Sequence, residues 1–67
     1  MKYQVGDVFA KPGRIVYIEK FERSIHNKDG CWIVKIFPDG DIERSYIDLT
    51  IMWRLLNIGY THYPVKE

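Results

Sequence analysis

The sequence has one cysteine and three prolines among its 67 residues, and it has no long apolar run. A single cysteine, Cys31, excludes an internal disulfide framework and a zinc site made of several cysteines. The apolar stretches fall well short of the roughly 20 residues that a membrane-spanning helix needs. The first residues also lack the apolar segment of a signal peptide. We therefore expect one small domain, residues 1–67, located in the cytoplasm.

An excess of charge of either sign is also missing, because the formal net charge is only +1. Residues 1–35 carry seven Lys or Arg against four Asp or Glu, and residues 36–67 carry three against five. A dedicated nucleic-acid-binding domain usually shows a stronger basic excess or a recognisable motif. Binding of nucleic acid or nucleotide therefore remains only the alternative function. It would use the basic residues of the strand segments, namely Arg14, Lys20, Arg23 and Lys35.

Apolar and aromatic side chains are abundant, at 46% and 15% of the residues. A chain this short buries only about 60% of its unfolded surface, so its core must be efficient. Large rings bury much area per residue, which favours a compact folded domain over disorder.

β-branched and aromatic residues gather in short segments between glycine, proline and aspartate, a pattern typical of strands joined by turns. One helix, residues 48–58, is predicted before the last strand. The expected class is α+β, a small antiparallel meander or an SH3-like partly open barrel of four to five strands. The predicted strands are residues 6–10, 14–23, 31–37, 41–46 and 60–64.

Two strands carry apolar residues on both sides. In residues 14–23, alternation places Ile15, Tyr17 and Phe21 on one side. Residues 31–37 are apolar on both sides, which predicts a central strand with something covering each face.

The opening Gly6-Asp7-Val8, the long second strand and the Asp39-Gly40 hairpin turn resemble the small barrels of SH3-like domains. The resemblance covers residues 5–46. It implies a strongly bent antiparallel sheet, although a helix of three turns departs from the single 3₁₀ turn usual in such barrels. The compact, aromatic-rich style also resembles small accessory proteins of tailed bacteriophages, many of which bind and inhibit host or defence proteins. That second resemblance implies an inhibitor or adaptor that works in the host cytoplasm.

The predicted helix has more apolar surface than one face of a sheet requires. Asp48 is expected to cap its N-terminus through the carboxylate, and Gly59 to follow its C-terminus. The apolar residues span roughly 220° of the helix, where a surface helix needs a stripe of about 100°. One stripe, expected to pack on the sheet, contains Leu49, Met52, Trp53 and Leu56; a second contains Ile51, Leu55 and Ile58.

The second stripe has no obvious cover within the chain. An exposed apolar patch marks association sites, so we expect this stripe to meet a protein partner or a second copy of the chain. Tyr60 and Tyr63 follow it and suit an interface, because each offers an apolar ring and a hydroxyl. The predicted partner-binding residues are Ile51, Leu55, Ile58, Tyr60 and Tyr63.

No set of residues indicates catalysis or metal binding. Cys31 lies among apolar neighbours, as a core side chain does, and His26 and His62 lack any short metal-ligand spacing. The acidic residues 39, 41 and 43 lie at a hairpin turn, where aspartate has a structural role. We therefore expect neither an enzyme nor a cofactor. The predicted function is a protein-binding module that blocks its partner by occlusion.

Overall fold

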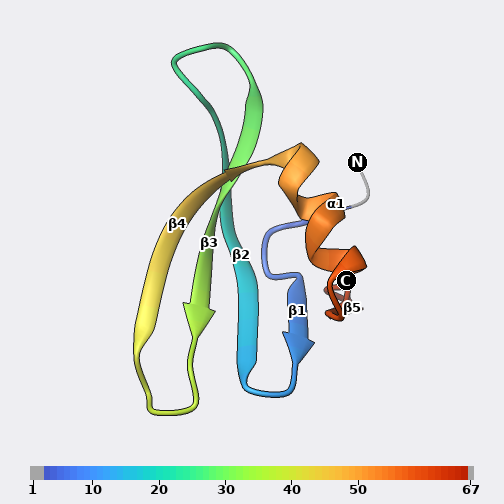
Figure 1. Cartoon of the computed structure of the whole chain (residues 1–67). Coiled ribbons are helices and arrows are strands. Elements are labelled where there is room, and N and C mark those ends of the chain that lie inside the picture. The colour runs from blue at the N-terminus through green and yellow to red at the C-terminus, as the bar shows by residue number, and fades with distance from the viewer. Residues whose placement is uncertain (1–2, 67) are drawn as a thin grey trace.

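The structure, a computed structural model, describes residues 3–66 except the side chains of Trp53, Leu56 and Asn57. It contains one antiparallel sheet of five strands and one helix (Figure 1). The strands lie in the order β4-β3-β2-β1-β5, and the sheet is not closed into a barrel. The elements are β1 (Val8–Lys11), β2 (Arg14–Arg23), β3 (Asp29–Ile36), β4 (Ile42–Asp48), α1 (Leu49–Asn57) and β5 (Thr61–Tyr63). The α+β class is confirmed, whereas the SH3-like resemblance stays a prediction.

The predicted Asp39-Gly40 hairpin turn is present, and a second tight turn joins the first two strands. Lys11 pairs directly with Arg14, so Pro12 and Gly13 alone connect β1 to β2. Gly13 has a φ of 84°, which the third position of a Pro-Gly turn requires and glycine adopts without strain. Between β3 and β4, the Gly40 amide donates to the Phe37 carbonyl at 3.0 Å. The turn chemistry of the sequence therefore fixes the register of both hairpins.

β2 contains a bulge that reverses the facing of its second half. The pairing with β3 shifts between Ile18 and Lys20, so Glu19 is an extra residue. An extra residue sends the following side chains to the opposite face. Phe21 consequently pairs with Cys31 and packs against the core. The prediction that Phe21 shares a face with Ile15 and Tyr17 was wrong, because strict alternation cannot continue through a bulge.

The core lies between α1 and one face of the sheet, which we call the inner face. Cys31 is buried there, as predicted, and its burial raises the pKa of the thiol. Four partly buried residues of the described elements pack around this cluster: Phe21, Ile47, Leu49 and Leu55. The buried cluster consists of Phe9, Val16, Ile18, Cys31, Ile33, Met52 and Tyr60.

The helix has the predicted place and nearly the predicted length. Met52 is fully buried and Leu49 packs on the core, as expected for the first stripe. The predicted contacts of Trp53 and Leu56 concern side chains outside the described part of the chain. Asp48 precedes the helix, but its side chain makes no capping hydrogen bond, so that detail of the prediction was wrong. Gly59 has a φ of 93°, the left-handed conformation that commonly ends a helix.

The opposite face of the sheet, which we call the outer face, has no helix or strand over it within residues 3–66. Ile15 of β2 and Ile42 of β4 lie on this face, and they are 45% and 69% exposed. The prediction of a cover on each face of residues 31–37 is therefore wrong for the outer face. Within residues 3–66, α1 is the one helix, and its described core residues, Leu49, Met52 and Leu55, pack on the inner face.

Candidate functional site: the outer face of the sheet

The five predicted partner-binding residues do not form one surface. Ile51 on α1 and Ile58 directly after it are exposed, whereas Leu55 packs partly against the core. Tyr60 is only 6% exposed and belongs to the buried cluster, so its ring has little surface to offer a partner. Tyr63 is exposed, but it lies on β5 opposite Val8. Among the described side chains of the helix segment, the exposed apolar ones are therefore two isoleucines, one on α1 and one directly after it.

A larger apolar surface is the outer face, where the strand register aligns side chains in rows across the sheet. Ala10 pairs with both Thr61 and Ile15, and Ile36 pairs with both Ile15 and Ile42. Directly opposed residues of antiparallel strands point to the same side. The first row therefore crosses all five strands and contains, in spatial order, Thr61, Ala10, Ile15, Ile36 and Ile42.

Two further rows continue the outer face toward the bulge. Val8 pairs with Tyr63 and Tyr17, and Val34 pairs with Tyr17 and Arg44. The second row therefore contains Tyr63, Val8, Tyr17, Val34 and Arg44. The third row contains Lys20, Trp32 and Tyr46. An antiparallel sheet that faces water normally alternates polar residues on its exposed side, so these apolar rows mark the outer face as unusual.

The charged groups on this face are already paired with neighbours on the same face. Arg44 Nε donates to Glu19 Oε1 at 2.6 Å, and its guanidinium carbon lies 4.5 Å from the centre of the Trp32 ring. Trp32 Nε1 donates to Glu22 Oε2 at 2.7 Å, and Lys20 forms an ion pair with the same carboxylate. A partner that covered the outer face would thus leave these charges with their existing partners.

Side-chain size changes across the face. In the first row, β5 and β1 contribute the small Thr61 and Ala10, whereas β3 and β4 contribute two isoleucines. The second row instead ends in a large side chain at both edges, Tyr63 on β5 and Arg44 on β4. The first row is therefore low toward the β5 edge and high toward the β4 edge, and a partner that fits this row needs the opposite gradient.

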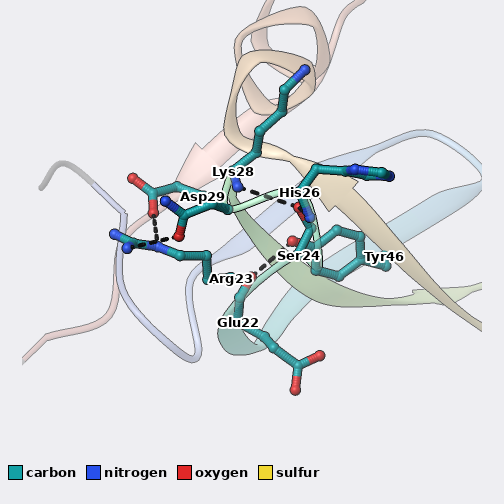
Figure 2. Close-up of polar contacts among 8 residues, drawn as sticks. Glu22, Arg23, Ser24, His26, Lys28, Asp29 and Tyr46 are labelled. Atoms are coloured by element: carbon teal, nitrogen blue, oxygen red, sulfur yellow. Dashed lines mark hydrogen bonds and ion pairs between the residues drawn. The ribbon is translucent and has the colours of Figure 1, made fainter.

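Beyond the third row, the β2–β3 hairpin ends in a loop that is ordered by its own hydrogen bonds (Figure 2). The Ser24 hydroxyl accepts from the backbone amides of His26 and Lys28, at 3.2 and 3.3 Å. Arg23 Nε donates to Asp29 at 3.3 Å. These contacts fix the loop shape and place Ile25 in solvent.

At the base of this loop, Tyr46 packs against Gly30 and donates its hydroxyl to the Glu22 carbonyl at 2.8 Å. A Cβ atom on Gly30 would lie 2.6 Å from Cζ of Tyr46, so the ring needs a glycine there. Desolvation, followed by the nearby Asp48 carboxylate, raises the pKa of Tyr46. These contacts hold the ring at the end of the outer face that is nearest to the β2–β3 loop.

The four residues of the nucleic-acid alternative do not share one face. Lys20 lies on the outer face, whereas the register places Arg14 and Lys35 on the inner-face side. Three of the four are paired with carboxylates: Lys20 with Glu22, Arg23 with Asp29 and Lys35 with Glu43. The guanidinium of Arg14 lies over the Phe37 ring. The structure therefore does not bring these cations together as one basic surface.

Among the candidate chemical groups, His62 has a partner that the sequence did not reveal. Its Nε2 lies 2.8 Å from the carboxylate of buried Asp7, and its ring stacks on Phe9 with centroids 4.6 Å apart. His26 is exposed in the β2–β3 loop. Within residues 3–66, no three His, Cys, Asp or Glu side chains are arranged to hold a metal ion.

Comparisons with protein-family models, with curated proteins and with solved structures find no match to this chain. Within the described residues, α1 is too short to cross a membrane, and no other helix is present.

Proposed function

We propose that this chain is a small, non-enzymatic protein-binding module whose docking surface is the outer face of its sheet. The observation that carries the proposal is the pair of mostly apolar rows that cross all five strands and that no helix or strand of residues 3–66 covers. Burying apolar area stabilises a complex by about 25 cal/mol per Å², and the fully buried centre of an interface is more apolar than its rim. Such a module acts by occlusion, because a docked sheet blocks whatever surface it covers.

The exposed part of the second helix stripe, Ile51 and Ile58, is a smaller second candidate for the docking surface. It lies on α1 and directly after it, on the other side of the sheet, so substitutions can distinguish the two surfaces. Binding of nucleic acid has less support, because its four predicted cations are divided between two faces and three have carboxylate partners. The phage-type inhibitor stays a prediction about which partner the module meets.

The test uses two isoleucine-to-lysine variants at positions of similar exposure. Ile15 lies in the middle of the first row of the outer face and Ile58 directly follows α1, with 45% and 57% of each residue exposed. The immobilised chain would be used to capture binding proteins, including a tagged second copy, and the captured proteins would be identified by mass. Ile15→Lys is expected to lose the captured protein, because burying an unpaired ammonium is costly, while Ile58→Lys retains it.

Circular dichroism would establish that both variants are folded. If Ile15→Lys captured the same proteins as the native chain, the outer face would not be the docking surface. If Ile58→Lys alone lost them, the helix surface would be the correct one.

A further inference from the structure

We infer that the occupant of the outer face is a second copy of this chain, related by a two-fold axis that runs along β2 between two facing sheets. This inference rests on the proposed function, since it names the partner of the same surface. The strand order β4-β3-β2-β1-β5 has β2 at its centre. A two-fold axis along β2 therefore places β3 of one copy over β1 of the other, and β4 over β5.

The first row is self-complementary in size under this symmetry. Ile36 on β3 would lie over Ala10 of the second copy, and Ile42 on β4 over its Thr61. Each large side chain thus meets a small one, and Ile15 meets its own equivalent at the axis. Facing sheets pack with strands within about 30° of each other, which keeps these pairs close. The size gradient of the first row is therefore the gradient that a second copy fills.

The second row is complementary in chemistry. Tyr17 would lie over its own equivalent, whereas Val34 is only 5% exposed and has little surface to offer a second copy. Arg44, already stacked on Trp32, would lie over Tyr63 of the second copy, whose ring is exposed in the single chain. An arginine between aromatic rings gains cation–π attraction without losing its ion pair with Glu19.

The size of the face predicts a weak dimer. Strands about 4.8 Å apart and rows about 7 Å apart, with margins for the side chains, give the face about 450 Å² per copy. Two copies would bury about 900 Å², below the roughly 1,200–2,000 Å² of stable specific interfaces and in the range of weak, transient ones. We therefore expect dissociation in the micromolar range rather than a permanent dimer.

Light scattering over a concentration series measures the association directly. The native chain is expected to change from a mass of 8.0 kDa to twice that value as its concentration rises from about 1 μM to about 1 mM. Ile15→Lys brings two ammonium groups together at the axis and should weaken association at least about 100-fold. Ile58→Lys should associate like the native chain. A mass of 8.0 kDa at every concentration, or equal association of Ile15→Lys, overturns the inference.

Cross-linking tests the symmetry. Ile42→Cys and Thr61→Cys would be treated with a short bismaleimide, each alone and as a mixture; the native thiol of Cys31 is buried and does not compete. Only the mixture should give a linked dimer, because Ile42 faces Thr61 across the interface. Linkage of Ile42→Cys with itself would instead place β4 over β4 and overturn the axis along β2.

These results separate the inference from the proposed function. If the chain remains monomeric while Ile15→Lys loses a different captured protein, the second copy is the wrong occupant and the outer face is still the docking surface. If Ile15→Lys changes neither self-association nor capture, both statements fail.

Discussion

Asp7 is a buried carboxylate that holds three segments of the chain together. It accepts hydrogen bonds from the Gln4 and Val65 amides, at 3.1 and 2.8 Å, and from the His62 ring. Its own backbone carbonyl accepts from the Ile18 amide on β2. Burial by itself would raise the pKa of Asp7, but the Val65 and His62 contacts outweigh it and hold this pKa below its usual value. Asp7 thus joins the N-terminal turn, the sheet and the C-terminal segment.

This arrangement predicts acid sensitivity. A carboxyl whose pKa is lower in the folded state contributes stability that is complete above its unfolded pKa of about 3.9, and that is lost as the pH falls through the folded pKa. The free energy of unfolding should therefore fall below about pH 4. Asp7→Asn should cost about 1–3 kcal/mol at neutral pH and flatten this dependence, because an amide cannot accept from all three donors. Urea unfolding across a pH series measures both effects.

Asp41→Asn is the control, since Asp41 is exposed beside the β3–β4 turn. It should leave both the stability and its pH dependence nearly unchanged. Equal pH profiles for Asp7→Asn and the native chain would contradict the proposed role of the carboxylate.

Among the elements, the second apolar stripe of the helix segment, defined by Ile51, Leu55 and Ile58, lies partly in the core and partly in solvent. Leu55 packs partly against the buried cluster, whereas Ile58 is 57% exposed at the helix end. Leu55→Ala should therefore cost about 1–2 kcal/mol of unfolding free energy, and Ile58→Ala about 0.5 kcal/mol or less. Chemical unfolding of the two variants measures the difference. Equal costs would show that the stripe is either all core or all surface.

Also at the scale of the elements, the sequence largely predicted where the strands begin and end. It did not predict on which face of the sheet each side chain lies. Residues 14–23 were predicted as one strand and form β2 with the same limits, because turn residues bound a β-branched run on both sides. The bulge at Glu19 left no mark in the sequence beyond two adjacent charged residues. Its position depends on pairing with β3, and it decides that Phe21 joins the core while Lys20 faces out.

At the scale of the whole molecule, the free energy of unfolding should rise with protein concentration if the outer face binds a second copy. Ligands that bind only the folded state raise its stability by mass action, and a second copy is such a ligand. Above the dissociation constant, each tenfold rise in concentration should add about 0.7 kcal/mol per copy and raise the Tm by about 4 °C. Thermal unfolding of the native chain should show this shift. Ile15→Lys should melt at one temperature throughout, and a native Tm independent of concentration would contradict the coupling.

The sequence by itself determined the elements, their order and their turns, because these depend on local propensity, on glycine and proline geometry, and on short-range alternation. It also identified the surplus of apolar surface, but it assigned that surplus to the helix. Only the tertiary structure decided which apolar side chains stay uncovered, because the face on which a side chain lies depends on contacts between distant segments. One helix covers one face of the sheet, Tyr60 completes the core beneath it, and the rows through Ile15 and Tyr17 are left uncovered on the other side.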